Sequence, residues 1–174
     1  HEQLKKVSAT CLASAEAFLS KAERELGKGV DPICFHLGLL ALEEVGMSIL
    51  NTINYMSETA RSDKESLATD EHIRKLFWAF WGGSMIRNTK WTKESIKQNR
   101  FIATTLHERR LETLYTDPHN PVAFDGRVKD REAKTIVELA RARLEVEKAS
   151  ELTEFKQGDI EEITWFFSAV EDVE

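Results

Sequence analysis

Apolar side chains recur at spacings of three and four along the first 26 residues, a period that places them on one face of a helix. The positions on this face are Leu4, Val7, Cys11, Ala15, Phe18, Leu19, Ala22 and Leu26. Gly27 and Gly29 follow at once, and glycine commonly ends a helix. The pattern therefore predicts an opening amphipathic helix that stops at these two glycines.

A second helix is predicted to begin at Asp31, which can cap it, with Pro32 in the favoured first position. The apolar pattern then continues to about Met56, where the polar stretch "SETARSDKES" interrupts it.

The rest of the chain carries further helical patterns separated by turn-forming residues. A third helix begins near Thr69, contains "HIRKLFWAFW" and ends or kinks at Gly82 and Gly83, and the segment from there to Lys93 is left open as helix or loop. The remaining expectations are a fourth helix from about Lys93 to Leu111, an irregular connection over 115–126, a fifth helix over Lys129–Lys148 and a shorter sixth over Asp159–Val170.

These elements predict a fold of the all-α class, a single-domain bundle of about five to six helices spanning residues 1–174. No internal repeat and no pair of strands is recognisable, and only 3 prolines and 8 glycines interrupt the helical patterns. A chain of this length can bury a substantial core, and short links favour antiparallel neighbouring helices.

The composition limits the classes of function. A net charge of -6 argues against broad, nonspecific adhesion to nucleic acid, although a local basic patch remains compatible with it. Cys11 and Cys34 lie in apolar helical patterns, which favours reduced core thiols in a cytosolic protein. No uninterrupted apolar run approaches 18 residues and no secretory leader is visible, so we expect a cytoplasmic protein with no membrane segment.

Two adjacent carboxylates interrupt the apolar stretch "LLALEEVGMSIL" in the second predicted helix. At about 100° per residue, Glu44 falls near the centre of an apolar arc, and Glu43 lies about 100° away. The arc comprises Ile33, Leu37, Leu40, Ala41 and Ser48. We therefore expect Glu44 to face the core, where it needs a cation or hydrogen-bond donors. Two interpretations stay open, a structural ion pair and a functional pocket.

Candidate partners for this acid lie on the third and fourth predicted helices. His72 flanks an apolar arc of the third helix, whereas Lys75 projects elsewhere and is expected to be solvated. On the fourth helix, Arg100 and His107 share a face with apolar residues, namely Ile96, Ala103 and Leu111. The alternative is that this side of the fourth helix is exposed to solvent.

Glu44, Arg100, His72 and His107 are therefore expected to converge between helices as a candidate catalytic set. Histidine can act as general acid or base near neutral pH, and arginine can hold a phosphate by two hydrogen bonds. Such a set suits cleavage of an RNA phosphodiester with the ribose 2′-hydroxyl as nucleophile. The same residues can equally form a polar lock between helices.

Metal and cofactor chemistry is not expected. There is no ExxH pair of the kind found in di-iron bundles, and the adjacent glutamates point to different faces. A glycine-rich phosphate loop and a GxSxG elbow are also missing. Trp78, Trp81 and Trp91 are expected in the core, whereas Trp165 and the two phenylalanines after it either dock the last helix or form a partner or dimer surface.

Four segments, in order, resemble the AbiV family of abortive-infection (phage-defence) proteins, within the wider all-α HEPN superfamily. The likeness covers most of residues 8–148. The four are the opening helix "SATCLASAEAFLSKAERELGKG", then "LGLLALEEVGMSIL", then "DEHIRKL", and finally "RRLETLYTDPHNP" with the alanine-rich "EAKTIVELARARLE" after it.

The resemblance assigns roles to particular residues. The family's polar motif positions fall on Glu43, Glu44, His72, Lys75, Arg110, Tyr115 and Asp117. Of these, Glu43, Lys75, Arg110, Tyr115 and Asp117 are candidates for substrate binding. Met47 is a departure, because a lysine is usual there after the two glutamates, and its loss puts full activity in doubt.

HEPN ribonucleases typically carry an arginine followed, after four to six residues, by a histidine. Arg100 and His107 meet this spacing, although Phe101 takes the place where a polar residue is common. The resemblance implies that His107 is the acid or base and Arg100 the phosphate holder. It also implies a homodimer, because HEPN sites are commonly completed between two copies.

The leading hypothesis is a phage-defence protein that acts on RNA or translation, with metal-independent RNA cleavage as the mechanism. The rival is a non-catalytic interaction protein that arrests translation, or binds a phage or antitoxin protein, through a helical surface. The acidic net charge, Met47 and the imperfect arginine–histidine motif favour the rival slightly.

Overall fold

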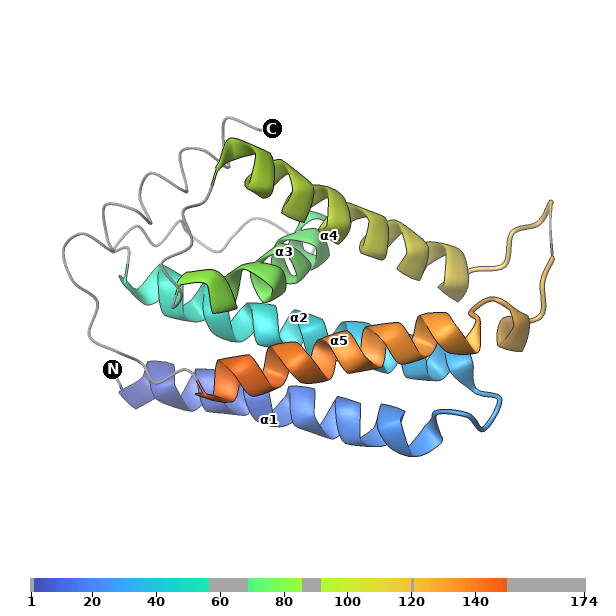
Figure 1. The fold of residues 1–174 in the computed structure, drawn as a ribbon, viewed down its shortest axis with the longest axis horizontal. Helices are drawn as coiled ribbons and strands as arrows, with labels where there is room; N and C mark the ends of the chain where they lie inside the picture. Colours follow the sequence, from blue (N-terminus) through green and yellow to red (C-terminus); the bar gives the residue numbers. More distant parts are fainter. Residues whose placement is uncertain (1, 57–68, 86–91, 120, 150–174) are drawn as a thin grey trace.

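The computed structural model describes residues 2–56, 69–85, 92–119 and 121–149, and within them the chain forms five α-helices and no strand (Figure 1). The helices are α1 (Glu2–Glu25), α2 (Asp31–Met56), α3 (Thr69–Met85), α4 (Lys93–Leu114) and α5 (Asp130–Ala149), with a short 3-10 helix η1 (Phe124–Gly126) before α5. The predicted all-α bundle is confirmed.

Helix α2 is the central element and contacts α1, α3 and α5. Its fully buried side chains include Phe35, Leu39, Leu42 and Val45, which form the middle of the core. The helix is also long and apolar enough to cross a membrane by length and composition, with a mean hydropathy of 1.6 over Asp31–Thr52, and 67% of that window is buried inside the bundle. A central core helix has this same composition, because it is apolar on most sides.

Two glycines let α2 approach its neighbours closely. A Cβ on Gly46 would collide with the backbone of α3, at the carbonyl of Lys75 and the amide of Ala79. A Cβ on Gly38 would instead meet Ile136 of α5, at 2.8 Å from a methyl carbon. The backbones of α2 and α3 therefore cross nearly in contact at Gly46, which fixes the position of α3.

An ion-pair network joins α1 to α5 at the surface. Arg141 donates to both carboxylate oxygens of Glu16, at 2.8 and 2.9 Å, and to both of Glu23, each at 2.8 Å. Lys148 also binds Glu16. These two cations lower the pKa of the Glu16 carboxyl to about 2. Exposed pairs of this kind contribute little singly, and the network sets the register of α5 along α1.

Helix α4 packs chiefly against α3 and lies apart from the α1–α2–α5 layer (Figure 1). Thr92 caps its start in a capping box with Ser95, so two otherwise unpaired amide groups are satisfied. The connection from α4 to α5 is held by Arg127, whose guanidinium donates to the carbonyls of Val122 and Leu114 at 3.1 Å each and to the Thr116 hydroxyl at 2.6 Å.

The helix bounds agree closely with the expectations from the sequence, including the irregular connection over 115–126. Gly27 and Gly29, with φ of 76° and 79°, form the turn between α1 and α2. Of the two alternatives for Gly82 and Gly83, an end is contradicted, because α3 continues to Met85, and a kink at these glycines stays a prediction. The expected sixth helix over Asp159–Val170, with Trp165 in it, lies outside the described residues.

Burial agrees with most of the predicted face of α1, although Val7 is exposed, and corrects that of α4. Cys11, Ala15, Leu19 and Ala22 are buried. On α4 the buried residues are Ile96, Ala103, His107 and Thr113, whereas Leu111 and Leu114 are exposed. The apolar spacing misplaced the last two turns, because this part of α4 meets α2 and α5 through polar side chains, Arg110 and Thr113 toward α2 and Arg109 toward α5, and not through Leu111 and Leu114. Trp78 is in the core, and both cysteines are buried free thiols. The side chains of Trp81 and Trp91 lie outside the description.

Candidate functional site

Of the two adjacent glutamates in α2, Glu43 is the buried one, at 5% exposure, and Glu44 is only partly buried. The expectation that Glu44 faces the core was therefore wrong. The predicted core arc is buried only in part: Ala41 and Ser48 are fully buried, whereas Ile33 is 43% exposed. Because α2 is apolar nearly all round, its own period could not tell which side its three neighbours would cover.

The Glu43 carboxylate binds side chains from two other helices. One oxygen, Oε1, accepts from Nη1 of Arg110 on α4, and the other, Oε2, lies 3.0 Å from Nδ1 of His72 on α3. Arg110 Nη1 also lies 3.1 Å from His72 Nδ1. A buried carboxylate needs this kind of compensation for lost hydration. The cluster of Glu43, His72 and Arg110 joins α2, α3 and α4 at one point.

The pairing selects a tautomer for the neutral form of His72. Glu43 is bound to a guanidinium and acts as an ionised acceptor, so it cannot donate to the ring. Nδ1 therefore carries the proton and donates it to Oε2 of Glu43, and Nη1 of Arg110, itself a donor, is a close neighbour of Nδ1 and not its hydrogen-bond partner. Nε2 is then left with a free lone pair, and the side chain of His72 is 38% exposed. A carboxylate that orients an accessible imidazole in this way produces a competent general base.

His107 on α4 lies against His72, with the two rings nearly parallel and their centroids 5.6 Å apart. It is buried, and neither ring nitrogen has a hydrogen-bond partner among the described residues. Burial lowers its pKa, and the charges of His72 and Arg110 add to this effect while Glu43 opposes it. His107 is therefore a neutral imidazole packed behind the more accessible His72.

A second polar contact ties α4 to α2. The Thr113 hydroxyl lies 3.3 Å from Nε2 of His36 and donates within its own helix to the carbonyls of Arg109 and Arg110. Because that hydroxyl proton is shared inside α4, His36 must donate from Nε2 to the Thr113 oxygen. Burial, together with the nearby charge of Arg110, lowers the pKa of His36.

The structure brings together four of the predicted site residues, namely Glu43, His72, His107 and Arg110, and separates the others. Arg100 precedes His107 by seven residues, about 10 Å along the axis of α4. Tyr115 and Asp117 follow the end of α4 in the exposed connection, where Asp117 accepts from the amide of His119 at 2.8 Å.

Glu44 belongs to a different neighbourhood. Burial raises the pKa of the Cys11 thiol to about 11, and the nearby Glu44 carboxylate adds to this effect, while the charge of Lys75 lowers it. Lys75 is thus partly buried near the α1–α2–α3 junction rather than fully solvated. A thiol with a raised pKa is a poor nucleophile at neutral pH.

Sequence reasoning placed Glu43 and Arg110 only through the family resemblance, and only as substrate-binding residues. Helical spacing could have identified Arg110 as a site residue, because Arg110 lies three residues after His107 and so shares its face of the helix. The same spacing of seven that joins Arg100 to His107 also joins His36 to Glu43 along α2. No comparable signal identified Thr113.

Among the described residues, no group of three or more histidine, cysteine, aspartate or glutamate side chains is placed to hold a metal ion. The polar cluster is instead a carboxylate, a guanidinium and two imidazoles.

Comparisons with known proteins add no identification. A scan against protein-family models, a search of curated proteins and a search of solved structures each find no match to this chain.

Acidification is expected to destabilise the protein through His36 and His107. A histidine whose pKa is lower in the folded than in the unfolded protein stabilises the fold fully above the ordinary pKa of 6.5. That stability is lost as the pH falls below 6.5, because the unfolded chain takes up the proton first. The free energy of unfolding should fall between about pH 7.5 and 5.5, by at most about 1.4 kcal/mol per pH unit for each histidine.

Urea unfolding at a series of pH values measures this effect. Replacing both His36 and His107 with glutamine should flatten the curve in this range, whereas His119→Gln in the exposed connection should leave it unchanged. An equally steep curve in the double variant would show that other groups carry the dependence. Glu16 does not contribute to the change in the free energy of unfolding in this pH range, because the stability from its lowered pKa is lost only below about pH 4.5.

Proposed function

We propose that the protein is a metal-independent endoribonuclease of the AbiV and HEPN kind, acting in phage defence in the cytoplasm as a homodimer. One observation carries the catalytic part of the proposal. The buried carboxylate of Glu43 is bound to Arg110 and orients a partly exposed imidazole, that of His72. The phage-defence context and the dimer rest on the resemblance alone.

His72 is the general base in this proposal. Its Nε2 takes the proton of a ribose 2′-hydroxyl, and the 2′-oxygen then attacks the adjacent phosphorus. The bond from phosphorus to the 5′-oxygen breaks, and that oxygen takes a proton from water. The hydroxide left behind takes the proton back from His72, which restores the neutral imidazole and the water. The products are a 2′,3′-cyclic phosphate and a free 5′-hydroxyl. The proposed reaction therefore needs no metal ion and no cofactor.

Arg110 is the group proposed to bind the phosphate. Its contacts with Glu43 and His72 both use Nη1, so within the described residues Nη2 and Nε remain to donate to a phosphate oxygen. Arginine suits this role because its planar donors match two oxygens at once. His107, buried behind His72, is proposed to position the base rather than to touch substrate.

The decisive experiment is incubation of a labelled, mixed-sequence RNA with the purified protein in excess EDTA. Wild type should produce fragments that end in a 2′,3′-cyclic phosphate, and a DNA of the same sequence should stay intact because it lacks the nucleophile. His72→Ala should reduce the rate by about 100-fold or more, as expected when a general base is lost. His119→Ala is the matched control and should retain full activity.

Three outcomes would contradict this assignment. They are no cleavage by wild type, cleavage that requires a divalent metal, and cleavage that survives His72→Ala. If Arg100→Ala and His107→Ala abolish cleavage while His72→Ala does not, the arginine–histidine pair of the resemblance is the site instead.

The second candidate is a non-catalytic interaction protein that arrests translation or binds a phage or antitoxin protein. The observation that favours it is the exposure of two aromatic side chains, Phe101 at 72% on α4 and Tyr115 at 68% just after it. Large apolar residues at such exposure are frequent in partner surfaces. Under this alternative, toxicity in cells survives His72→Ala and is lost on Phe101→Ser with Tyr115→Ser.

A further inference from the structure

A groove of about 520 Å³ lies between α4 and α5 and is separate from the Glu43 cluster, with which it shares no residue. Its apolar surface comes from Phe35 of α2, Leu106 of α4 and Ile136 of α5. The methyl-bearing side chains of Thr105 and Thr135 extend this surface. At the groove, Arg109 of α4 reaches Glu132 of α5. Its volume is in the range of small-molecule sites.

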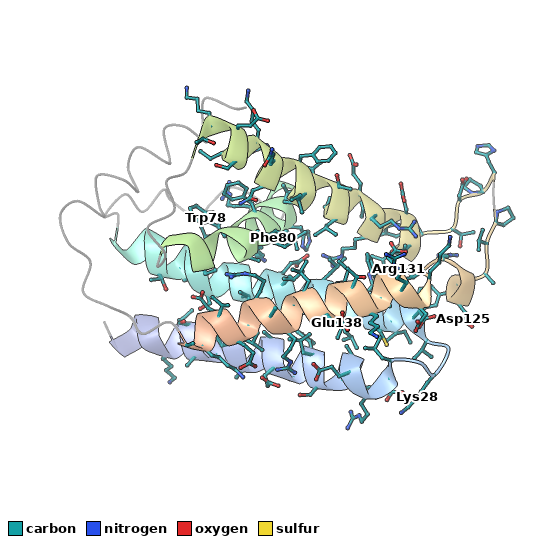
Figure 2. All side chains as sticks on the ribbon, in the orientation of Figure 1. Lys28, Trp78, Phe80, Asp125, Arg131 and Glu138 are labelled. Carbon is teal, nitrogen blue, oxygen red and sulfur yellow. The ribbon has the colours of Figure 1, made fainter. Side chains whose placement is uncertain are left out.

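The polar residues of the groove gather at one end, where the C-terminal half of α4 meets the start of α5. Arg109 is already committed there, since it donates to Glu132 at 2.6 Å and to the carbonyl of Arg127 at 2.8 Å. Lys129 and Arg131 are different, because both are exposed and the described residues offer neither of them an ion-pair partner. Figure 2 labels Arg131 near the start of α5, beside α4.

The electrostatics of this end favour an anion. Arg109 and Glu132 cancel each other, so Lys129 and Arg131 leave an excess of positive charge among the groove residues. The N-terminus of α5 adds the positive end of a helix dipole. Asp130 in the first turn of α5 and Glu112, which pairs with Arg109 at 3.1 Å, oppose this charge, but neither lines the groove. An apolar trough with a cationic mouth complements a molecule with an apolar tail and an anionic head.

We propose that this groove binds a single-chain acyl anion, with the hydrocarbon tail against Phe35, Leu106 and Ile136 and the carboxylate between Lys129 and Arg131. A peptide strand fits less well, because both walls are helices whose backbone amides are already bonded within each helix and offer no edge to pair with. The proposal is independent of the RNA-cleavage proposal.

Dodecanoate, below its micelle concentration, is the probe, with binding measured by titration calorimetry on the full chain. Wild type should bind it at micromolar concentrations, and decanoate should bind about 15-fold more weakly, since each methylene removed weakens binding about four-fold. Dodecanol, which has the same tail without the charge, should bind at least ten-fold more weakly than dodecanoate.

Variants locate the site. Thr105→Trp fills the groove from an exposed position and should abolish binding without touching the core. Lys129→Ala with Arg131→Ala should weaken dodecanoate at least ten-fold and leave dodecanol unchanged, whereas Lys134→Ala, an exposed lysine of α5 outside the groove, should change neither. Circular dichroism and the melting temperature confirm that each variant is folded.

The following binding results would overturn the proposal that the groove binds an acyl anion. Equal binding by wild type and Thr105→Trp would overturn the proposal, as would equal binding of dodecanoate and dodecanol, or no binding at all. Displacement of dodecanoate by an acidic, apolar peptide of higher affinity would assign the groove to a protein partner and would also overturn it.

Discussion

Replacing Gly46 with alanine is expected to destabilise the protein by about 3 kcal/mol, despite alanine being the better helix former. The added Cβ would overlap the carbonyl oxygen of Lys75 and lie 3.0 Å from the amide nitrogen of Ala79. Both groups are backbone of α3, so no side chain can rotate away. Relief requires α3 to move off α2, which uncovers the core around Leu76 and Phe77.

The matched control for this variant is Gly38→Ala in the same helix. Its Cβ would lie 2.8 Å from a methyl carbon of Ile136 and 3.4 Å from the nearest backbone atoms of α5, so a side-chain shift absorbs part of the overlap. We expect a loss of about 1 kcal/mol or less. Urea unfolding measures both values. A Gly46→Ala protein as stable as wild type would contradict the close crossing of α2 and α3.

Replacing Glu43 with glutamine is expected to cost about 3 kcal/mol of stability. The change keeps the size of the side chain but removes the charge that compensates Arg110 and accepts from His72. Breaking a buried ion pair by removing one partner leaves the other charge uncompensated, which is the costly case. The same variant should abolish RNA cleavage under the proposed mechanism, because His72 loses the group that fixes its tautomer.

Glu132→Gln provides a matched control, because Glu132 pairs with the adjacent arginine, Arg109, and is more exposed than Glu43. It should cost about 1 kcal/mol or less. Replacing Glu43 and Arg110 together with leucine should recover much of the lost stability, since an apolar pair removes both charges. That double variant should nevertheless remain inactive on RNA, which separates a structural lock from a catalytic site. Full cleavage by the double variant would exclude the cluster from catalysis.

The family resemblance and the packing select partly different residues. The resemblance gave the acid or base to His107 and the phosphate to Arg100, whereas the proposed mechanism uses His72 and Arg110, which both contact Glu43. His107 nevertheless links the two interpretations, because its ring stacks on His72. Parallel assays of the His72, His107, Arg100 and Arg110 variants on one RNA therefore test both at once.

Apolar periodicity and turn-forming residues were sufficient to predict the helices within a few residues of their ends. This worked because capping groups, glycines and prolines act locally, through the backbone of the residues beside them. Thr69, a candidate capping residue, was placed at the start of α3 for this reason, and α4 begins at Lys93 as the apolar pattern predicted. Gly82 and Gly83 lie inside α3 and do not end it, since a glycine inside a helix costs only about 1 kcal/mol and packing can override it.

The orientation of each helix was decided by the tertiary structure alone. The sequence determined that α2 is helical and that an acid interrupts its apolar run, but which of Glu43 and Glu44 is buried depended on where α1, α3 and α5 pack around it. Likewise, histidine and arginine on α3 and α4 were visible in the sequence, while their meeting at Glu43 depended on the close crossing at Gly46. Local chemistry determines where the helices form, and long-range contacts determine which of their faces meet. The reason is that the sequence of a helix that is apolar on most sides does not indicate which side packs against which neighbour.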